Sequence, residues 1–279
     1  MWMDVDIGKK YQNELFCLVL HRPGCRINHL FAFKSLTLIA TPKNIQEIDL
    51  STGAVFLVNK PLRMTSFFVV DRIKRAIWRS SKQKIKIGHA GTLDPLASGL
   101  LILCTGRMTK KIDDYQAREK HYTGHFTLGA STPSYDLETE VIEFADPTGI
   151  SLDALENCRK SFLGYQELVP PAHSAVKIGG KRAYTLARNG EEVVLAAKPI
   201  YISEMTINTE HFPRIGFSIH CTKGTYIRSI AHEFGRRLGN AAYLSALTRQ
   251  KIGEYALEDA WELDELIKIL NPFNPPLEP

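Results

Sequence analysis

The 279-residue sequence contains few cysteines, no long apolar run and no recognisable targeting segment. No stretch reaches the roughly 18 apolar residues that a membrane-spanning helix needs. The N-terminus lacks the basic stretch, apolar core and small-residue cleavage site of a secretory signal. The five cysteines stand far apart, at 17, 25, 104, 158 and 221, without a C-x-x-C pair. This spacing argues against a disulfide framework and against structural zinc, and we expect a protein of the reducing cytoplasm.

The sequence also lacks the G-x-x-x-x-G-K-S/T pattern of a phosphate-binding loop, so a nucleotide-binding enzyme of that type is a weak alternative. No motif indicates a metal, nucleotide or redox cofactor, and we expect none. Hydrophobic residues make up 44% and charged residues 23% of the chain, which is ordinary for a globular protein with a substantial core.

Positive charge is unevenly distributed along the chain. The net charge is +5, but residues 254–279 carry seven of the 30 acids and one of the 35 bases, which leaves +11 on the rest. The densest basic run spans residues 72–86, with Asp71 as the only acid nearby in the sequence. Such a run attracts a phosphate backbone. A solvated helix face is the equally reasonable alternative.

The most informative segment is KIGHAGTLDPLASG at 86–99, which precedes the apolar run LLILC at 100–104. It contains three glycines and a single carboxylate, Asp94. Glycines let the backbone approach a ligand closely, and an adjacent buried strand holds a loop rigid. Asp94 is therefore a candidate catalytic residue. The structural alternative is a plain turn, because Asp-Pro often begins one.

Hydrophobic periodicity predicts a mixture of strands and helices. Strands are expected at 54–58, 100–104, 120–128, 137–144, 200–208 and 215–221. One helix is expected from the cap Thr65 or Ser66 through Ile77, and a second after the cap Ser151, with Leu152, Leu155, Cys158 and Phe162 on one face. A third is expected after Gly224, through Arg237 and ending at Gly239, and a last one at about 261–270. The elements follow no regular βαβ rhythm. This order predicts an α+β fold with a largely antiparallel sheet.

Further segments carry residues suited to chemistry. They are KPLRMTS at 60–66, KHY at 120–122 with LGASTPSYD at 128–136, PPAHSAVK at 170–177 with GKRAY at 180–184, KGTYIR at 223–228, and LSALTR at 244–249. The first four have ordinary structural alternatives: a strand end before a helix cap, a half-buried strand tyrosine, a Pro-led turn with a basic hairpin, and a surface helix arginine.

Taken together and in order over residues 54–260, these segments resemble the motifs of the bacterial-type tRNA pseudouridine synthases, the TruB family. The resemblance implies the pseudouridine synthase fold, with a central mixed, mostly antiparallel sheet, flanking helices and an RNA-binding cleft. It also implies isomerisation of uridine to pseudouridine at position 55, in the TΨC loop of tRNA. The base must leave the stack to be reached, so the enzyme is expected to flip it.

The same resemblance assigns roles to individual residues. Asp94 is the nucleophile, Arg228 is its pairing partner, and Tyr122 stacks on the base and is a candidate proton acceptor. The residues expected to bind substrate are His89, which fills or braces the space left by the flipped base, the pocket-wall residue Tyr226, and Asp136, Lys60 and Lys177.

Two positions depart from the family pattern. Arg63 stands where the family usually has glycine, and a positive φ would strain an arginine there. His173 stands where the family often has tyrosine.

We expect three regions: an N-terminal extension without an assigned role at 1–48, a catalytic domain at 49–260, and a short helix with a Pro-rich end at 261–279. The 26 residues after Gly253 are too few for the RNA-binding PUA domain of many family members. The expected partner is the TΨC stem-loop of tRNA, with no membrane and no obligate protein partner. The alternatives are a non-catalytic tRNA-binding or folding protein on the same scaffold and a small-molecule hydrolase with a carboxylate nucleophile.

Overall fold

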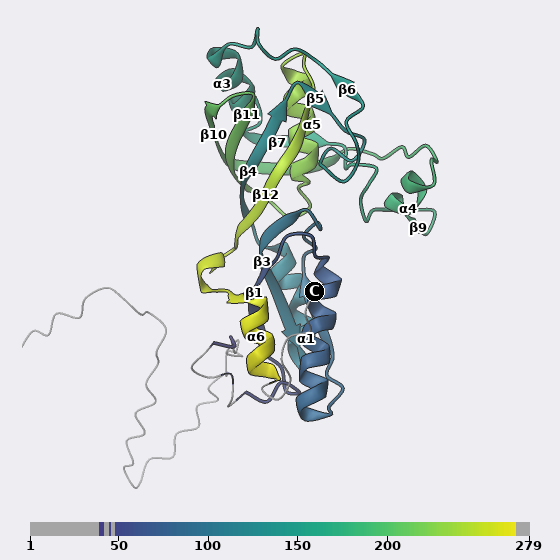
Figure 1. Cartoon of the computed structure of the whole chain (residues 1–279), viewed down its shortest axis with the longest axis vertical. Coiled ribbons are helices and arrows are strands. Elements are labelled where there is room, and N and C mark those ends of the chain that lie inside the picture. The colour runs from purple at the N-terminus through teal and green to yellow at the C-terminus, as the bar shows by residue number, and fades with distance from the viewer. Residues whose placement is uncertain (1–38, 42–44, 46–47, 272–279) are drawn as a thin grey trace, which may run out of the picture. The chain divides into compact units, whose positions relative to one another are not determined.

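A computed structural model describes residues 39–41, 45 and 48–271, which form an α+β unit built on one large sheet (Figure 1). The sheet runs in the order β14-β1-β3-β12-β4-β11-β10-β7. These strands are β14 (Trp261–Glu262), β1 (Val55–Lys60), β3 (Ala97–Thr105), β12 (Ala242–Ile252), β4 (Lys120–Leu128), β11 (Arg214–Cys221), β10 (Lys198–His211) and β7 (Gly164–Leu168). Two short strands extend it, because β2 (Ile87–Ala90) pairs with β3 and β13 (Tyr255–Ala256) pairs with β12.

The sheet is mixed and mostly antiparallel, as predicted. Its parallel pairs are β1 with β14 and β3 with β12. The central strand β12 joins the half that contains β1 and β3 to the half that contains β4, β11 and β10. Its register with β3 places Arg249 opposite Gly99. Because β3 begins three residues after Asp94, this pairing fixes one side of the Asp94 loop.

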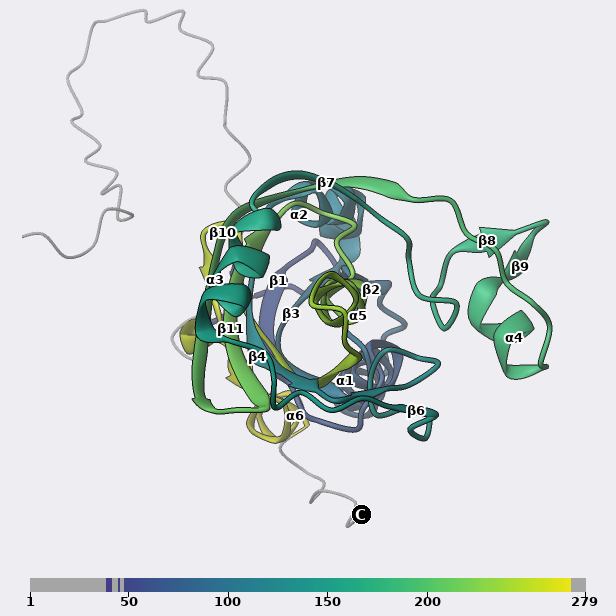
Figure 2. The same cartoon turned by 90° about the horizontal axis from the view of Figure 1, so that it is seen from above.

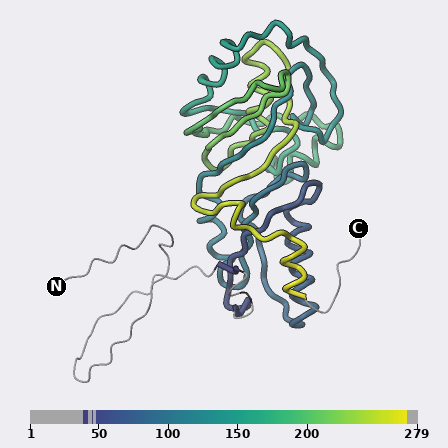
Figure 3. The backbone as a smooth tube through the Cα atoms, turned by 60° about the vertical axis from the view of Figure 1, so that its left-hand side comes forward, coloured from purple at the N-terminus to yellow at the C-terminus, as the bar shows by residue number. Residues whose placement is uncertain are grey.

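Six α-helices lie within the described ranges. They are α1 (Ser66–Ser81), α2 (Ile112–Ala117), α3 (Leu152–Ser161), α4 (Ala183–Arg188), α5 (Ile227–Arg237) and α6 (Leu263–Leu270), with short 3-10 helices at Gly106–Lys111 and Leu257–Asp259. Figure 2 shows α5 on the concave side of the curved sheet. Figures 1 and 3 show α6 beside α1, where Arg72 and Asp264 form an ion pair of 3.0 Å.

Two small hairpins lie outside the main sheet. One pairs β5 (Ala130–Ser131) with β6 (Glu143–Phe144), and the other pairs β8 (Lys177–Ile178) with β9 (Lys181–Arg182). The second hairpin and the following α4 project away from the sheet (Figures 1 and 2).

Helix α1 begins at one of the predicted caps. The Thr65 hydroxyl accepts a hydrogen bond of 3.0 Å from the backbone N–H of Phe68, which satisfies a donor that the first helical turn leaves open. Val69, Ile73 and Ile77 follow at helical spacing and are buried against β1, β3 and α6. Ser66, the first residue of α1, bonds the backbone of Leu93, so the first turn of α1 lies beside the Asp94 loop.

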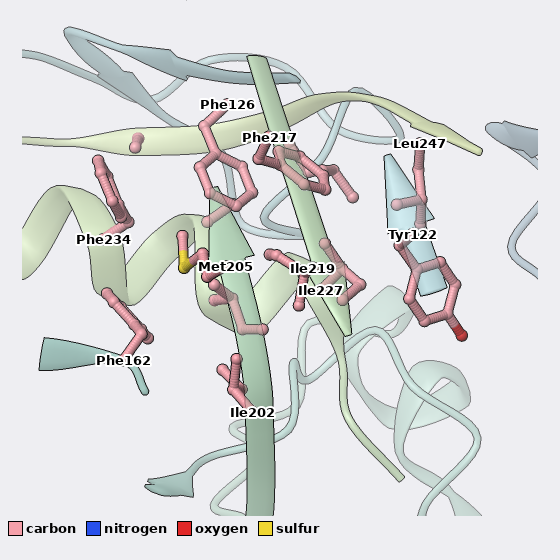
Figure 4. Packing of buried hydrophobic residues seen from close by; sticks show 14 of the residues in the cluster. Tyr122, Phe126, Phe162, Ile202, Met205, Phe217, Ile219, Ile227, Phe234 and Leu247 are labelled. Atoms are coloured by element: carbon pink, nitrogen blue, oxygen red, sulfur yellow. The ribbon is translucent and has the colours of Figure 1, made fainter. Parts of the chain in front are cut away.

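A second cluster of buried side chains lies between α5, α3 and the strands β4, β10, β11 and β12. Phe126 stacks on Phe217 at a centroid distance of 4.2 Å, and Phe234 of α5 packs against Phe126 (Figure 4). Tyr122 lies at the edge of this cluster, with its hydroxyl pointing away from the phenylalanines (Figure 4). This hydrophobic cluster therefore ends at Tyr122, which the resemblance assigns to the active site.

Most expected elements are present, and two expectations are wrong. Of the strand predicted at 137–144, only Glu143–Phe144 is a strand, because the preceding residues form turns. Leu152 was expected on the buried face of α3 but is 69% exposed. Strand β12 was not predicted as a strand at all.

The predictions for the N-terminal extension, the C-terminal end and the cysteines concern residues that the structure describes only in part. Of the predicted extension, the described residues include Ala40, whose N–H donates to Val55 and whose carbonyl accepts from Trp261. The remaining part of that region, the end at 272–279, and Cys17 and Cys25 lie outside the described residues. The three-region division stays a prediction. Cys104, Cys158 and Cys221 are buried free thiols.

Among the described residues, no helix is long and apolar enough to cross a membrane. Within the same ranges, no three His, Cys, Asp or Glu side chains are grouped so that they could hold a metal ion.

Candidate active site

The loop that carries Asp94 is held from two sides. The Ser66 hydroxyl, at the start of α1, accepts from the N–H of Leu93 at 2.9 Å and donates to the carbonyl of Leu93 at 3.0 Å. The N–H of Arg63 donates to the carbonyl of Pro95 at 2.7 Å. Asp94 therefore sits between two anchored neighbours, which fixes its backbone before any ligand binds.

Asp94 forms an ion pair with Arg228, as the resemblance to the TruB family implies. Its Oδ2 lies 2.9 Å from the Nε of Arg228, and its Oδ1 accepts from Nη2 at 3.3 Å. The Arg228 side chain is 4% exposed, whereas the Asp94 side chain is 35% exposed. A carboxylate that is held by a buried guanidinium and still open on one side can reach a ligand.

Arg228 is itself fixed by groups from other elements. Its Nη1 donates to the carbonyls of His173 at 2.9 Å and Ser134 at 3.3 Å. Its Nε also lies 3.6 Å from the Oδ2 of Asp136, which is buried. Burial raises the pKa of Asp136, and the charge of Arg228 acts in the opposite direction. One guanidinium thus bridges two carboxylates, so Asp136 contacts the pairing partner of Asp94 and holds it in place.

Lys60 requires a correction. We predicted that it binds substrate, but its side chain is fully buried, and its ammonium donates to the carbonyls of Pro61 at 2.8 Å and Met64 at 2.7 Å. Burial lowers the pKa of Lys60 to about 8, and the nearby Asp94 charge partly offsets that effect. Lys60 therefore positions the turn that precedes α1, and a substrate would not reach its ammonium in this arrangement.

Two tyrosines lie near Asp94. Burial raises the pKa of Tyr122 and of Tyr226, and the charge of Asp94 adds to both shifts. Tyr122 comes from β4, and Tyr226 immediately precedes α5. A raised pKa keeps the phenol neutral, which suits stacking and hydrogen bonding better than the role of proton acceptor.

The two remaining predicted residues lie on strands that carry neither member of the ion pair. His89 lies on β2, where burial and the charge of Arg249 lower its pKa. Lys177 lies exposed on β8, in the projecting hairpin. Neither makes a hydrogen bond or ion pair with Asp94 or Arg228 among the described residues. Their predicted contacts with substrate stay predictions.

Sequence reasoning missed Arg249 as a site residue. This β12 side chain is 1% exposed, and it donates through Nε to the carbonyl of Leu100 at 2.7 Å and through Nη2 to that of Gly91 at 3.1 Å. It also faces Tyr122 across the β12–β4 ladder. Arg249 thus ties both ends of the Asp94 loop to the central strand. The available signal was its place in the LSALTR segment, the last of the family-like motifs.

Comparisons with known proteins show the family of this chain. Residues 78–227 match the family model described as TruB family pseudouridylate synthase (N terminal domain). A Parabacteroides distasonis protein named tRNA pseudouridine synthase B is 43% identical over 220 residues, covering 78% of this chain and 94% of that protein. A Bacteroides thetaiotaomicron protein of the same name is 46% identical over 218 residues, covering 76% and 90%.

A solved structure shares the fold. A chain in the crystal structure of a Cbf5-Nop10-Gar1 complex matches with a TM-score of 0.59 and 25% identity, over 80% of this chain. The match covers 55% of that longer chain. The family model, the two close relatives and the Asp94–Arg228 pair lead to one conclusion: this chain belongs to the TruB family of pseudouridylate synthases.

Proposed function

We propose that this chain converts uridine to pseudouridine in tRNA, at position 55 of the TΨC loop, with Asp94 as the nucleophile. The single observation that carries the proposal is the partly exposed Asp94 carboxylate held by the buried Arg228 guanidinium. The names of its close relatives, tRNA pseudouridine synthase B, support tRNA as the substrate. Position 55 rests on the resemblance of the motifs to the TruB family.

The reaction is an isomerisation, so no atom is gained or lost. The target base leaves the stack and enters the site beside Asp94. Asp94 attacks the nucleotide or drives glycosidic cleavage, and the N1–C1′ bond breaks. The uracil turns in the pocket and a C5–C1′ bond forms; C5 loses a proton and N1 gains one. In this sequence Arg228 holds the carboxylate, while Tyr122 and Tyr226 supply flat walls for the base.

The charges of the described surface support RNA as the ligand, although less uniformly than the sequence suggests. In the basic run of α1, Arg72 pairs with Asp264 at 3.0 Å and Arg75 pairs with Asp71 at 2.7 Å. In the folded chain, Asp264 therefore lies beside this basic run in addition to Asp71. Lys177 and its hairpin neighbours are exposed and project from the sheet, which suits them to contact phosphates.

A binding protein without activity is the main alternative. Binding alone requires no carboxylate at the site, because a negative charge repels phosphate. Asp94 lies on an anchored loop and forms an ion pair with the buried Arg228, and this arrangement favours catalysis. A small-molecule hydrolase is the less favoured alternative, because it gives no role to the exposed lysines of the projecting hairpin.

The test uses the full-length protein and a tRNA transcript, followed by digestion to nucleosides and quantification of pseudouridine. We expect one pseudouridine per tRNA from the unsubstituted protein. A transcript with cytidine at position 55 serves as the matched RNA control and should yield none. Product on the control transcript would move the target to another position, and tight binding without product on either would favour the binding-protein alternative.

A further inference from the structure

The turn that carries Arg63 combines an unfavourable backbone conformation with tight anchoring. Arg63 has φ 63°, in the left-handed region where the Cβ of any residue except glycine is crowded. The buried Lys60 ammonium bonds the carbonyls on both sides of this turn, at Pro61 and Met64. The Arg63 N–H bonds the carbonyl of Pro95. The turn is thus determined by its surroundings, and glycine would adopt it without strain.

The side chain at this strained position is an exposed cation. Among the ion pairs and side-chain hydrogen bonds of residues 48–271, none includes the Arg63 guanidinium. By contrast, Arg72 and Arg75 on the following helix each have an acidic partner. A strained residue whose charged side chain has no ion pair or hydrogen bond within residues 48–271 is a candidate for a contact with a ligand.

The surroundings of Arg63 indicate the kind of ligand. Its backbone contacts the residue that follows Asp94, so its side chain starts at the rim of the candidate active site. Leu62 precedes Arg63 and Phe67 follows it by four residues, and their side chains are 54% and 74% exposed, so one short segment presents a cation, an apolar side chain and an aromatic ring to solvent. A segment with an exposed guanidinium and an exposed aromatic ring is suited to a nucleic-acid strand, with phosphate on the arginine and a base on the ring.

We propose that Arg63 binds a backbone phosphate of the RNA strand next to the target uridine and thereby helps to position that nucleotide over Asp94. This inference rests on the proposed function for its substrate. Arg63 acts here as a positioning residue, and its contact with RNA compensates for the strain of its backbone.

Three substitutions separate charge from strain. Arg63→Gly removes both, Arg63→Ala removes the charge but keeps a Cβ in the left-handed region, and Arg63→Lys keeps the charge and the Cβ. The matched control is Lys268→Ala, which removes one exposed positive charge from α6. Each protein is assayed for tRNA affinity across a salt series, for single-turnover pseudouridine formation and for thermal unfolding.

We expect Arg63→Gly and Arg63→Ala to weaken tRNA binding equally, by about three- to tenfold near 0.1 M salt, and to lower the log–log salt slope by about 0.7–0.9. Arg63→Lys should stay within about twofold of the unsubstituted protein. Only Arg63→Gly should raise the unfolding temperature. Lys268→Ala should leave affinity and salt slope unchanged.

Two results would overturn the inference. One is unchanged affinity and salt slope in Arg63→Gly together with a raised unfolding temperature, which would make the arginine a tolerated strain without function. The other is an equal loss in the Lys268→Ala control. Failure of the proposed function gives a different pattern, because the unsubstituted protein would then form no pseudouridine whatever the substitutions do to binding.

Discussion

Replacement of Arg228 by alanine is the perturbation whose effect follows most directly from the geometry. The guanidinium lies 2.9 Å and 3.3 Å from the two oxygens of Asp94, and 3.6 Å from Asp136. It also donates to the carbonyls of Ser134 and His173. Arg228→Ala therefore frees the Asp94 carboxylate and leaves the buried Asp136 without its cation.

These contacts set the size of the effect. Removal of one partner from a fully buried charge pair costs about 3–5 kcal/mol, and the 35% exposure of Asp94 reduces this to about 2–3 kcal/mol for its pair with Arg228. If that loss falls on the transition state, the rate constant drops by about 30- to 200-fold. The tRNA affinity should change by less than about tenfold, because phosphate contacts elsewhere supply most of it.

The assay is single-turnover pseudouridine formation at saturating protein, with affinity measured separately on the same tRNA. Arg228→Ala also destabilises the fold, so the double variant Arg228→Ala with Asp136→Asn removes the unpaired buried carboxylate. It should recover stability without recovering the rate. Arg72→Ala, which breaks the more exposed pair with Asp264, is the control and should cost less than about 1 kcal/mol of stability and no activity. A folded Arg228→Ala protein with a rate within about tenfold of the original would refute the reasoning.

Three further outcomes are expected. The unfolding free energy of the unsubstituted protein, measured by urea titration, should rise between pH 8 and about 10.5, because the folded chain releases the Lys60 proton near pH 8 whereas the unfolded chain holds it to about 10.4. Stability is therefore gained as pH rises through that window and lost as pH falls. Lys60→Met should flatten this rise, and parallel profiles for the two proteins would contradict the prediction. Lys82→Gly should raise the unfolding free energy by about 0.5 kcal/mol, because Lys82 ends α1 with a φ of 57°, which glycine adopts without strain. The substitution removes only a cation–π contact of 4.9 Å with Trp78, and a lower melting temperature would count against the prediction. Gly99→Ala should destabilise the fold by about 2–4 kcal/mol and reduce activity. Gly99 has a φ of +107°, and a Cβ at this position would lie 2.4 Å from the carbonyl oxygen of Arg249. Unchanged stability of the variant would show that β12 can shift to make room.

Much of the fold could be predicted because local signals and burial agree. Strand β4 coincides with the predicted 120–128, and α1 begins after one of the two expected caps, Thr65. In these segments a single period, two for a strand or 3.6 for a helix, matches one buried face. The pairing of Asp94 with Arg228, 134 residues apart, could not be found from such periods, and it came from the resemblance of the motifs alone.

Strand β12 shows why the rest could not be predicted. Its ladder with β4 shifts register between Leu244 and Ala246 and again between Arg249 and Lys251. Each shift breaks the alternation of buried and exposed side chains, so the sequence of β12 shows no clean period of two. In addition, an arginine is rarely buried without partners, and the carbonyls that bond Arg249 come from a segment about 150 residues away.

The failed strand at 137–144 has a different cause. The Thr132 hydroxyl donates to the carbonyl of Asp136 at 2.6 Å, and the N–H of Glu138 donates to the Asp136 carboxylate at 2.9 Å. These side-chain bonds satisfy the backbone locally and compete with strand pairing. The apolar residues Ile142 and Phe144 of this segment are 69% and 81% exposed, so no buried face holds it as a strand.

The most direct test of the central claim compares the unsubstituted protein with Asp94→Asn and Asp94→Glu on the same tRNA. Asparagine keeps the size of the side chain and loses the charge, and glutamate keeps the charge but moves it by about one C–C bond, roughly 1.5 Å. The account predicts stoichiometric pseudouridine from the unsubstituted protein, none from Asp94→Asn, and a rate reduced by at least about 10²-fold for Asp94→Glu, with tRNA affinity within about tenfold in all three. Pseudouridine formation by Asp94→Asn, beyond what trace deamidation to aspartate explains, would contradict it.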